Sequence, residues 1–443
     1  MKIRFVTLGC KLNFAESSAI SKALLQRGHT RAKQGEEADI CVINTCSVTD
    51  NADHKDRQTI HRIHRQNPNA IIIVTGCYAQ LQPEQIAQIE GVDYVLGQNE
   101  KYEITQLVDK IERLRDSLED ASLQDAASGY SLEAQKIRVA NIREVEEFHG
   151  AYSKDDRTRC FLKVQDGCNY FCTYCTIPYA RGKSRNPAIS DIIKDAQEAI
   201  SQGAKEIILT GVNIGDFGRS TGESFLELLR ALDGLEAKGE RREAKGMDYR
   251  IRISSCEPNL LTDEIIDFVA QSKHFAPHFH IPLQSGSNEV LSIMKRRYTR
   301  ELFEERVQHI KQVMPHAFIG VDCMVGVRGE TEGCFNDYVD FIKRLDVSQL
   351  HVFTYSERAN TRMLELDVCI VPKAERQRRS KILHEISEEK TRTFYANQTG
   401  REAIVLWESK KEGDQMAGFT ENYVKVYRPY DKAKVNTFEV IRL

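Results

Sequence analysis

The sequence lacks a long hydrophobic run and has almost no net charge. No apolar stretch approaches the roughly 20 residues that a membrane-spanning helix needs, so we expect no membrane partner. The chain carries 62 Lys and Arg against 65 Asp and Glu, a formal net charge of −3. This balance provides no global attraction to nucleic acid, and an RNA-binding surface would have to be a local patch.

A secretion signal is also missing from the first residues. The stretch MKIRFVTLGCKLNFAESS has a short apolar run that breaks at Gly9, and it shows no cleavage pattern. We therefore expect a cytoplasmic protein. In a reducing compartment, twelve cysteines favour metal binding or catalysis, at least for some of them, over a framework of disulfides.

The length and the hydrophobic patterning predict an α/β protein of three domains. A chain of 443 residues is too long for one core, because cores stop growing beyond roughly 250–300 residues. Buried-strand and amphipathic-helix patterns alternate over residues 1–112, which predicts a parallel α/β domain. Residues 113–153 are polar, charge-rich and weakly patterned, and we expect a linker with some helix.

The alternation of strands and helices resumes over residues 154–386. It predicts a complete or partial (β/α) barrel. A helical pattern at 374–400 is followed by short strand patterns such as EAIVLWES and NYVKVYRPY. Residues 388–443 are therefore expected to form a small β-barrel, a kind of module that often binds RNA.

Three cysteines lie within eight residues of the stretch DGCNYFCTYCTIPYARG. They are Cys168, Cys172 and Cys175, called the radical set below. On a regular helix this span rises about 10 Å and would string the sulfurs along one face. Thiolates that hold one cluster must instead converge, so we predict a loop, and Gly167 just before it makes that path easier.

Thiolates are soft ligands that suit iron–sulfur clusters or zinc. A structural zinc site would need four ligands, commonly as two C-x2-C pairs. Here one such pair occurs, and neither a fourth thiol nor a histidine lies nearby in the sequence. Three thiolates on a four-iron cluster leave one iron open to a substrate or cofactor. A zinc site and a chance grouping of buried cysteines are the alternatives.

A second set of cysteines is spread over the first domain. Cys10, Cys46 and Cys77, called the auxiliary set below, each follow a predicted strand, in TLGC, INTC and VTGC. Because open α/β sheets place their ligands at the carboxyl ends of the strands, these thiols can converge at one edge. They too would leave one iron of a four-iron cluster open. Free buried cysteines are the alternative.

The spacing C-x3-C-x2-C, with Tyr174 before the last cysteine, resembles the signature of the radical S-adenosylmethionine (SAM) enzymes. The resemblance implies that the open iron binds the amino and carboxylate groups of SAM. One electron from the cluster then cleaves SAM to methionine and a 5′-deoxyadenosyl radical. It also makes Tyr174 a candidate SAM contact, and the barrel predicted at 154–386 fits that family's core.

The cysteines of the auxiliary set lie in short motifs that resemble those of a subfamily of these enzymes, the methylthiotransferases. TLGCKLNFAES, NTCSVT and TGCYAQ are similar to its N-terminal domain, where three cysteines hold an auxiliary four-iron cluster. The resemblance covers almost the whole chain, and REAIVLWE and GFTENYVKV resemble its C-terminal TRAM module, an RNA-binding β-barrel. Two departures are mild: Val327-Arg328 replaces the usual Phe-Pro before GET, and SERANT lacks the usual Pro and Gly after YS.

The resemblance implies two [4Fe-4S] clusters and two molecules of SAM per turnover. One SAM would methylate a sulfur carried on the auxiliary cluster, and the other would be cleaved at the radical cluster. The radical removes hydrogen from C2 of an adenine, and the methylthio group takes its place. Around the radical set, the chain is most similar to members that modify N6-threonylcarbamoyladenosine (t6A) at position 37 of tRNA.

The resemblance also implies partners. The tRNA would present adenosine 37 from the single-stranded anticodon loop, where a base can be splayed into a pocket. An electron donor such as flavodoxin or ferredoxin is expected, and the sulfur source stays open. The alternatives are isopentenyladenosine 37 of tRNA, an aspartate of a ribosomal protein, and a non-catalytic iron–sulfur RNA-binding sensor.

Several charged and polar residues are further candidates. Asn213 and Glu257 end predicted barrel strands, where active-site residues gather, and are candidate SAM contacts. Lys163, Arg181 and Arg185 flank the radical set and are candidates for phosphate or cofactor contacts, with solvated charges as the alternative.

The remaining aromatic, histidine and cysteine residues have weaker signals. Trp407 and two tyrosines of the last module could stack on RNA bases, or they could fill its core. We expect the histidine-rich stretch DHKDRQTIHRIHRQNPN to be a solvated or RNA-facing helix rather than a metal site. The residues concerned are Tyr423 and Tyr427; His54, His61 and His64; and the presumed structural thiols Cys41, Cys160, Cys256, Cys323, Cys334 and Cys369.

Overall fold

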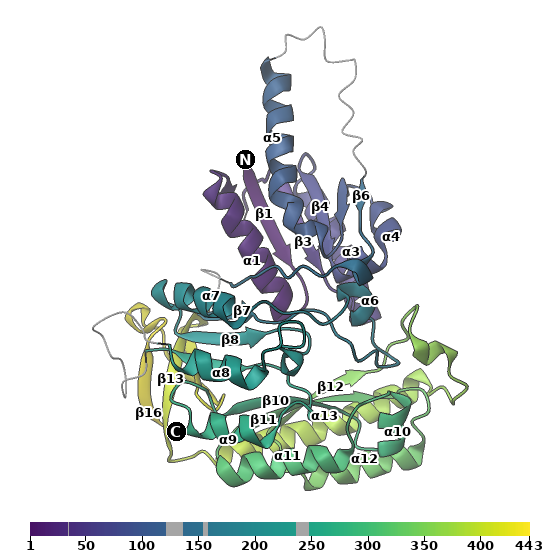
Figure 1. Ribbon diagram of the computed structural model, residues 1–443, viewed down its shortest axis with the longest axis vertical. Helices are drawn as coiled ribbons and strands as arrows, with labels where there is room; N and C mark the ends of the chain where they lie inside the picture. The colour runs from purple at the N-terminus through teal and green to yellow at the C-terminus, as the bar shows by residue number, and fades with distance from the viewer. Residues whose placement is uncertain (34, 121–135, 154–157, 236–247) are drawn as a thin grey trace. The chain divides into compact units, whose positions relative to one another are not determined.

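A computed structural model describes residues 1–33, 35–120, 136–153, 158–235 and 248–443 of the chain. The chain forms two compact units (Figure 1). The first unit contains Met1–Glu147 together with Thr176–Lys183, and the second contains Phe148–Cys175 and Ser184–Leu443. The segment that follows the radical set therefore belongs to the N-terminal unit, although the radical set itself belongs to the other.

The first unit is built on a parallel sheet of six strands in the order β2-β1-β3-β4-β5-β6. Its centre is formed by β1 (Lys2–Thr7), β3 (Ile40–Thr45) and β4 (Ile71–Gly76), as predicted from the buried strand patterns. Every residue of β3 is buried, as expected for a parallel strand covered on both faces. The shorter strands are β2 (Thr30–Arg31), β5 (Tyr94–Leu96) and β6 (Ile137–Arg138).

Helices cover both faces of this sheet. Ile40 and Val42 of β3 pack in one hydrophobic cluster with α1 and α5, whereas Cys41 and Ile43 pack in another with α2. This split follows from the alternation of side chains along a strand. The helix α5 extends into the range that we expected to be a linker. The helices are α1 (Lys11–Gln26), α2 (Asp50–Gln66), α3 (Cys77–Leu81), α4 (Pro83–Ala87), α5 (Ile104–Asp120) and α6 (Ile177–Arg181), with 3-10 turns η1 (Glu100–Glu103) and η2 (Ile142–Glu144).

The second unit begins with a partial (β/α) barrel of six parallel strands. They form two sheets, in the orders β7-β8-β9 and β10-β11-β12. Single parallel bridges, from Ile251 to Phe275 and from Ser255 to His280, connect β9 and the second residue after it to the region of β10. The strands are β7 (Arg159–Lys163), β8 (Glu206–Thr210), β9 (Arg250–Ile253), β10 (His278–Gln284), β11 (Phe318–Val325) and β12 (Gln349–Thr354).

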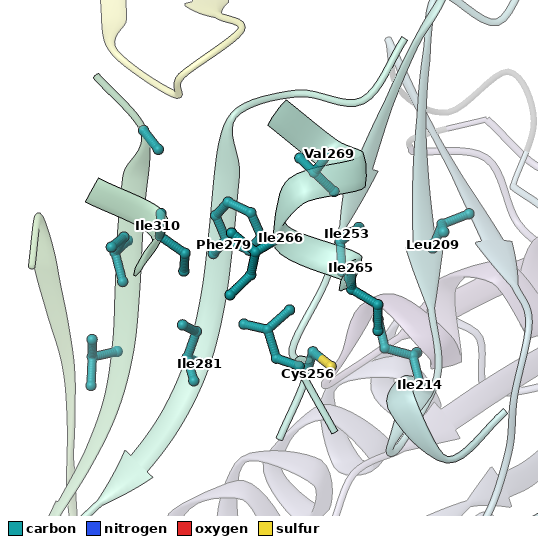
Figure 2. Close-up of a cluster of buried hydrophobic side chains, with 14 of the residues drawn as sticks. Leu209, Ile214, Ile253, Cys256, Ile265, Ile266, Val269, Phe279, Ile281 and Ile310 are labelled. Atoms are coloured by element: carbon teal, nitrogen blue, oxygen red, sulfur yellow. The ribbon is translucent and has the colours of Figure 1, made fainter. Parts of the chain in front are cut away.

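The hydrophobic core of the barrel lies between the strands and the helices outside them. Figure 2 shows Ile253 of β9 and Ile281 of β10 beside helix residues such as Ile266 and Ile310. Cys256 belongs to this core, in agreement with a purely structural thiol. The helices are α7 (Ile189–Ser201), α8 (Phe225–Asp233), α9 (Asp263–Gln271), α10 (Asn288–Ile293), α11 (Arg300–Val313) and α12 (Glu332–Arg344), with 3-10 turns η3 (Ile214–Asp216) and η5 (Arg362–Glu365).

A long helix leads from the barrel into the C-terminal module. This helix, α13 (Lys373–Ala396), is continuous across the domain boundary expected near residue 387. The module is an antiparallel sheet in the order β15-β14-β13-β16, consistent with a TRAM domain. Its elements are β13 (Glu402–Glu412), β14 (Gln415–Thr420), β15 (Lys425–Pro429) and β16 (Phe438–Arg442), with the 3-10 turn η6 (Lys432–Lys434).

A buried ion cluster fastens this module to the amino ends of the barrel strands. The carboxylate of Glu206 is fully buried and binds both Arg250 and Arg252, the latter at 3.0 Å. Arg250 also donates to the backbone oxygens of Ile404 at 3.1 Å and Phe419 at 2.9 Å. Burial alone would raise the pKa of Glu206, but the neighbouring guanidinium groups hold it well below its usual value.

Within the described part of the chain, no helix is both long and apolar enough to cross a membrane.

Candidate metal centres

The radical set lies in an irregular loop after β7, as the spacing predicted. No helix or strand is assigned from Gly167 to Cys175, all of which the structure describes. The loop turns back on itself through positive φ angles at Gly167 (68°) and Phe171 (51°). A backbone bridge between Asp166 and Arg185 closes its base. Glycine suits the first of these turns because it adopts positive φ at no steric cost.

Residues distant in sequence hold this loop in place. The Thr173 hydroxyl donates to the Ile293 oxygen at 2.9 Å, and the Thr173 oxygen accepts from the Met363 nitrogen at 2.8 Å. The Gln165 side chain donates to the Gly167 oxygen at 2.7 Å and accepts from the backbone nitrogen of Asn213 at 2.8 Å. Gln165 thereby joins the start of the loop to the carboxyl end of β8, a role that the sequence analysis missed.

Arg296 is the cation beside the radical set. Its guanidinium donates to the Cys172 sulfur at 3.1 Å, to the Tyr174 hydroxyl at 3.4 Å and to the Tyr298 hydroxyl at 3.1 Å. It also forms a short ion pair with Glu257, and its side chain is only 3% exposed. The carboxylate of Glu257, a candidate SAM contact, therefore already binds a cation of the protein.

Asn213 has the environment expected of a ligand-binding side chain. The residue is 2% exposed, and neither its side-chain oxygen nor its nitrogen has a hydrogen-bond partner among the described residues. A buried amide without partners is costly, so this group is poised for a polar ligand. Together with the soft donor set of three thiols, it fits a cluster that binds SAM.

Burial affects the thiols themselves. It raises the pKa of Cys168 to about 11 and also raises the pKa of Cys172, where Arg296 works in the opposite direction. Because the thiolate is the ligand form, binding of a metal cluster must displace these protons.

The three residues of the auxiliary set follow neighbouring strands at one edge of the first sheet. Cys46 directly follows β3 and Cys77 directly follows β4, and the two strands are paired in parallel up to Thr45 and Gly76. Cys10 precedes α1, after the neighbouring strand β1. The sequence-based expectation that three carboxyl ends converge is therefore met in the geometry.

Gly9 permits a close approach between two of these segments. Its φ angle is 91°, and a Cβ atom at this position would lie 2.8 Å from the Cys46 sulfur. Any larger residue would displace Cys46 or the loop before Cys10. The three thiols also interact electrostatically: burial, and then the charges of Cys77 and Cys10, raise the pKa of Cys46 to about 12.

Polar side chains surround the auxiliary set. Gln98 donates to the Cys77 sulfur at 3.2 Å, and Asn13 lies 3.9 Å from the Cys10 sulfur. On the other side, the Cys46 backbone nitrogen donates to Asp56 at 2.8 Å, and burial raises the pKa of Asp56 to about 7. None of these partners was singled out from the sequence.

Arg181 belongs to the auxiliary site rather than to the loop of the radical set. It ends α6, which packs against α3, the helix that begins at Cys77. The guanidinium donates to Asn13 at 2.6 Å and to Glu16 at 3.1 Å, and its positive charge acts to lower the pKa of the Cys77 thiol, which burial raises. Proximity in sequence to Cys175 had suggested a different place for this residue.

Neither set is arranged around a single point. Within the described residues, no three His, Cys, Asp or Glu side chains are grouped so that they could hold one metal ion. A four-iron cluster differs from a single ion because each thiolate binds a separate iron. Three soft thiols at each site fit such a cluster with one iron left open.

Comparison with known proteins shows the family of the chain. The model of uncharacterized protein family UPF0004 matches residues 2–97, and the model of the radical SAM superfamily matches residues 162–342. The threonylcarbamoyladenosine tRNA methylthiotransferase MtaB of Bacillus subtilis (strain 168) is 37% identical over 430 residues, covering 96% of this chain and 89% of that protein. The chain belongs to the radical SAM methylthiotransferase family.

Other similar proteins extend this result. MtaB of Aquifex aeolicus (strain VF5) is 35% identical and covers 97% of each chain. The tRNA-2-methylthio-N(6)-dimethylallyladenosine synthase of Pelotomaculum thermopropionicum (strain DSM 13744 / JCM 10971 / SI) is 31% identical, covering 94% of this chain and 88% of that protein. Among solved structures, the radical SAM methyltransferase TsrM from Kitasatospora setae has a TM-score of 0.54 at 15% identity, over 79% of this chain and 72% of that one. That likeness shows a shared fold.

Membership of the radical SAM superfamily implies SAM and a [4Fe-4S] cluster.

The other two cations predicted near the radical set form ion pairs with one carboxylate of this methylthiotransferase. Lys163 binds Asp166 at 2.8 Å, and Arg185 binds the same carboxylate at 3.3 Å. Both serve to close the base of the loop, which disfavours the predicted phosphate contacts.

The aromatic residues of the TRAM module differ in exposure. Trp407 is buried in the core of the module, as the alternative interpretation had it. Tyr423 packs in a cluster with Phe318 and Phe394 of the barrel unit. Tyr427 is 49% exposed, and the Lys425 ammonium lies 4.7 Å from the centroid of its ring.

The histidines and remaining cysteines follow the structural interpretation. His54 and His61 are exposed on α2, and His54 lies 2.9 Å from Gln58. His64 is half-buried against Gly91. The buried cysteines outside the two sets are Cys41, Cys160, Cys256, Cys323 and Cys334, whereas Cys369 is exposed.

The two departures from the family pattern contact each other. Arg328, where the family usually has proline, binds Glu357 at 3.1 Å, inside the SERANT segment. Asn360 has a φ angle of 64°. Asparagine tolerates the left-handed conformation better than most residues, so it can replace the glycine that is usual in this segment.

Proposed function

We propose that this methylthiotransferase places a methylthio group on C2 of t6A at position 37 of tRNA. The presence of two separate sites of three thiols carries the proposal, since the chemistry needs both a radical source and a sulfur carrier. The names of the relatives support t6A: the two MtaB proteins described above are 37% and 35% identical, against 31% for the dimethylallyladenosine synthase.

The residues of each site would divide the work. The radical set would hold one [4Fe-4S] cluster with SAM, and the auxiliary set would hold a second cluster. When bound, these groups supply a 5′-deoxyadenosyl radical and a methylated sulfur, at the expense of two molecules of SAM. The buried amide of Asn213 would bind SAM, and Gln165 would hold it in position beside the loop.

The substrate and the electron donor follow from this chemistry. Adenosine 37 lies in a single-stranded loop of tRNA, from which a base can be splayed and stacked on an exposed ring such as that of Tyr427. A one-electron donor of the flavodoxin or ferredoxin type would reduce the radical cluster.

The test is mass spectrometry of tRNA nucleosides from a strain that lacks this gene, compared with its parent. We expect loss of the 2-methylthio form of t6A alone, and its return with the wild-type gene. Loss of the isopentenyladenosine derivative instead would move the assignment to the second candidate, which the Pelotomaculum relative favours. No change in either nucleoside would overturn the proposed tRNA activity.

The sensor alternative is separated by the chemistry itself. Under anaerobic, reducing conditions the purified enzyme should convert SAM to 5′-deoxyadenosine. A protein that binds a cluster but yields no 5′-deoxyadenosine would contradict the proposed function and favour a non-catalytic role.

A further inference from the structure

Arg181 and Lys101 bring two positive charges to the auxiliary site. Lys101 is 1% exposed and binds the buried carboxylate of Glu16 at 2.5 Å. Arg181 is also 1% exposed and binds the same carboxylate at 3.1 Å. The two cations therefore share Glu16, and both act on the Cys77 thiol by lowering its pKa against the larger opposing effect of burial.

The contacts of Arg181 reach two of the three segments that carry the auxiliary set. Asn13 and Glu16 lie on α1, which begins just after Cys10. Cys77 begins α3, and α6 packs on that helix. The guanidinium thus ties α6, which packs on the helix that begins at Cys77, to α1 through hydrogen bonds of fixed direction.

We propose that Arg181 is a positioning residue that sets the charge, and with it the reduction potential, of the auxiliary cluster. The proposal rests on the proposed function, because it assumes a cluster on the auxiliary set. Reduction adds an electron, so a nearby cation stabilises the reduced form. Glu16 opposes this effect, because its negative charge destabilises the reduced form.

The opposite signs of Arg181 and Glu16 provide the test. A full-length parent variant with all three radical-set cysteines changed to alanine would carry only the auxiliary cluster. After anaerobic reconstitution, the midpoint potential is measured by a redox titration followed by electron paramagnetic resonance. Arg181→Gln should lower the potential, and Glu16→Gln should raise it. For Arg181→Gln we expect at least about a tenfold change in the oxidised-to-reduced ratio, which is about 59 mV for one electron.

Two further variants make the comparison specific. Arg181→Lys keeps the positive charge but loses the planar guanidinium group with its several donors. The potential of its auxiliary cluster should therefore lie between those of the parent and Arg181→Gln. Arg115→Gln removes the same charge from an exposed position on α5, 3.7 Å from Asp39, and should leave the potential unchanged.

The outcomes separate this inference from the proposed function. Full iron content with the same potential in the parent, Arg181→Gln and Glu16→Gln would overturn the role of Arg181 alone. Absence of iron from the parent variant would overturn the auxiliary cluster, and the charge proposal with it. Folding is checked by thermal unfolding, and in Arg181→Gln the Glu16 carboxylate still has Lys101 as a partner. If Arg181→Gln failed to fold, the shifts of Glu16→Gln and Arg181→Lys would still decide the question.

Discussion

The two cysteine sets are assembled in opposite ways. The radical set lies within one loop of eight residues, whereas the auxiliary set comes from the ends of three neighbouring strands. Their cations differ as well. Arg296 binds the radical set and is paired with Glu257, while Arg181 and Lys101 at the auxiliary set share Glu16. The comparison shows that two sites with the same three thiol ligands can differ in the net charge around them. Residues far away in the sequence supply that difference.

The difference in charge between the two sites suits the proposed reaction. A radical cluster must pass its electron to SAM, so a strongly stabilised reduced state would work against it. An auxiliary cluster that carries sulfur accumulates negative charge, which nearby cations stabilise. The predictions below test this comparison, from the largest expected effect to the smallest.

Loss of any thiol of either set should abolish methylthiolation, but the two sets should fail differently. Cys46→Ala should lose the auxiliary iron and still produce 5′-deoxyadenosine from SAM. Cys172→Ala should keep the auxiliary iron and produce none. Iron analysis, against an expected total of about eight atoms in the wild type, and chromatography of the SAM products check both outcomes.

The matched control for these variants is Cys369→Ala, because this thiol is exposed and lies outside both sets. It should keep full activity and iron. If Cys10→Ala also kept full activity and a full iron complement, the auxiliary half of the proposal would be wrong.

The buried carboxylate of Glu206 tests the effect of a charge that pairs with arginines and contacts neither set of thiols. Glu206→Gln should destabilise the second unit by about 3–5 kcal/mol, since Arg250 and Arg252 would lose their counter-charge. Because the pKa of Glu206 is lowered in the fold, its stabilisation is present above the unfolded pKa and is lost only in strong acid. Thermal unfolding should therefore show a constant difference from wild type between pH 5 and pH 8.

The same variant gives a clean contrast with the cluster sites. Neither cluster potential should change in Glu206→Gln. If the difference in stability between Glu206→Gln and the wild type grew or vanished between pH 5 and pH 8, Glu206 would not stay ionised over that range. That result would contradict its role as the counter-charge of Arg250 and Arg252.

Arg296→Gln should lower the potential of the radical cluster, by about a tenfold change in the oxidised-to-reduced ratio, or about 59 mV. The variant loses the hydrogen bond to the Cys172 sulfur and a positive charge. It is measured in a full-length background with the auxiliary cysteines changed to alanine. Arg297→Gln, which removes the same charge from a guanidinium that donates to the Asn169 oxygen instead, is the control.

A smaller shift in Arg297→Gln would show that the contact with the sulfur matters beyond net charge. Equal shifts in the two variants would reduce the role of Arg296 to long-range electrostatics. The double variant Arg296→Gln, Glu257→Gln should recover stability that the single change loses, because it leaves no unpaired carboxylate.

Asn213→Ala should have the smallest effect, a weakening of SAM binding by about fivefold, or about 1 kcal/mol for one hydrogen bond. The potential of the radical cluster should stay as it is, since Asn213 makes no contact with a ligand sulfur among the described residues. Equilibrium binding of SAM to the reconstituted enzyme measures the effect. Unchanged SAM affinity would remove Asn213 from the site.

Much of the local structure could be predicted from the sequence. The strands that end before Cys46 and Cys77 form as expected, and the radical set lies in the expected loop. Both follow from patterns a few residues long: continuous apolar runs for buried parallel strands, and a thiol spacing that a helix could not use.

The partners of the thiols could not be predicted in the same way. Arg296 lies far from the radical set in the sequence, and no spacing or motif links it to Cys172. Arg181 was assigned by its closeness to Cys175 in sequence, and the fold places it beside Cys77 instead. The domain boundaries at 113 and 387 stay predictions, since α5 and α13 both run across them.

The sequence by itself determined the two sets of thiols, the alternation of strands and helices, and the family. These features depend on residue type and spacing along the chain, which local sterics and ligand chemistry convert into structure. Only the tertiary structure decided which charges meet which thiols. Glu16, Lys101 and Arg181 come from α1, the 3-10 turn η1 and α6 of the first unit, and no spacing along the chain brings them together. Arg181 reaches Glu16 from α6, the helix that packs against α3.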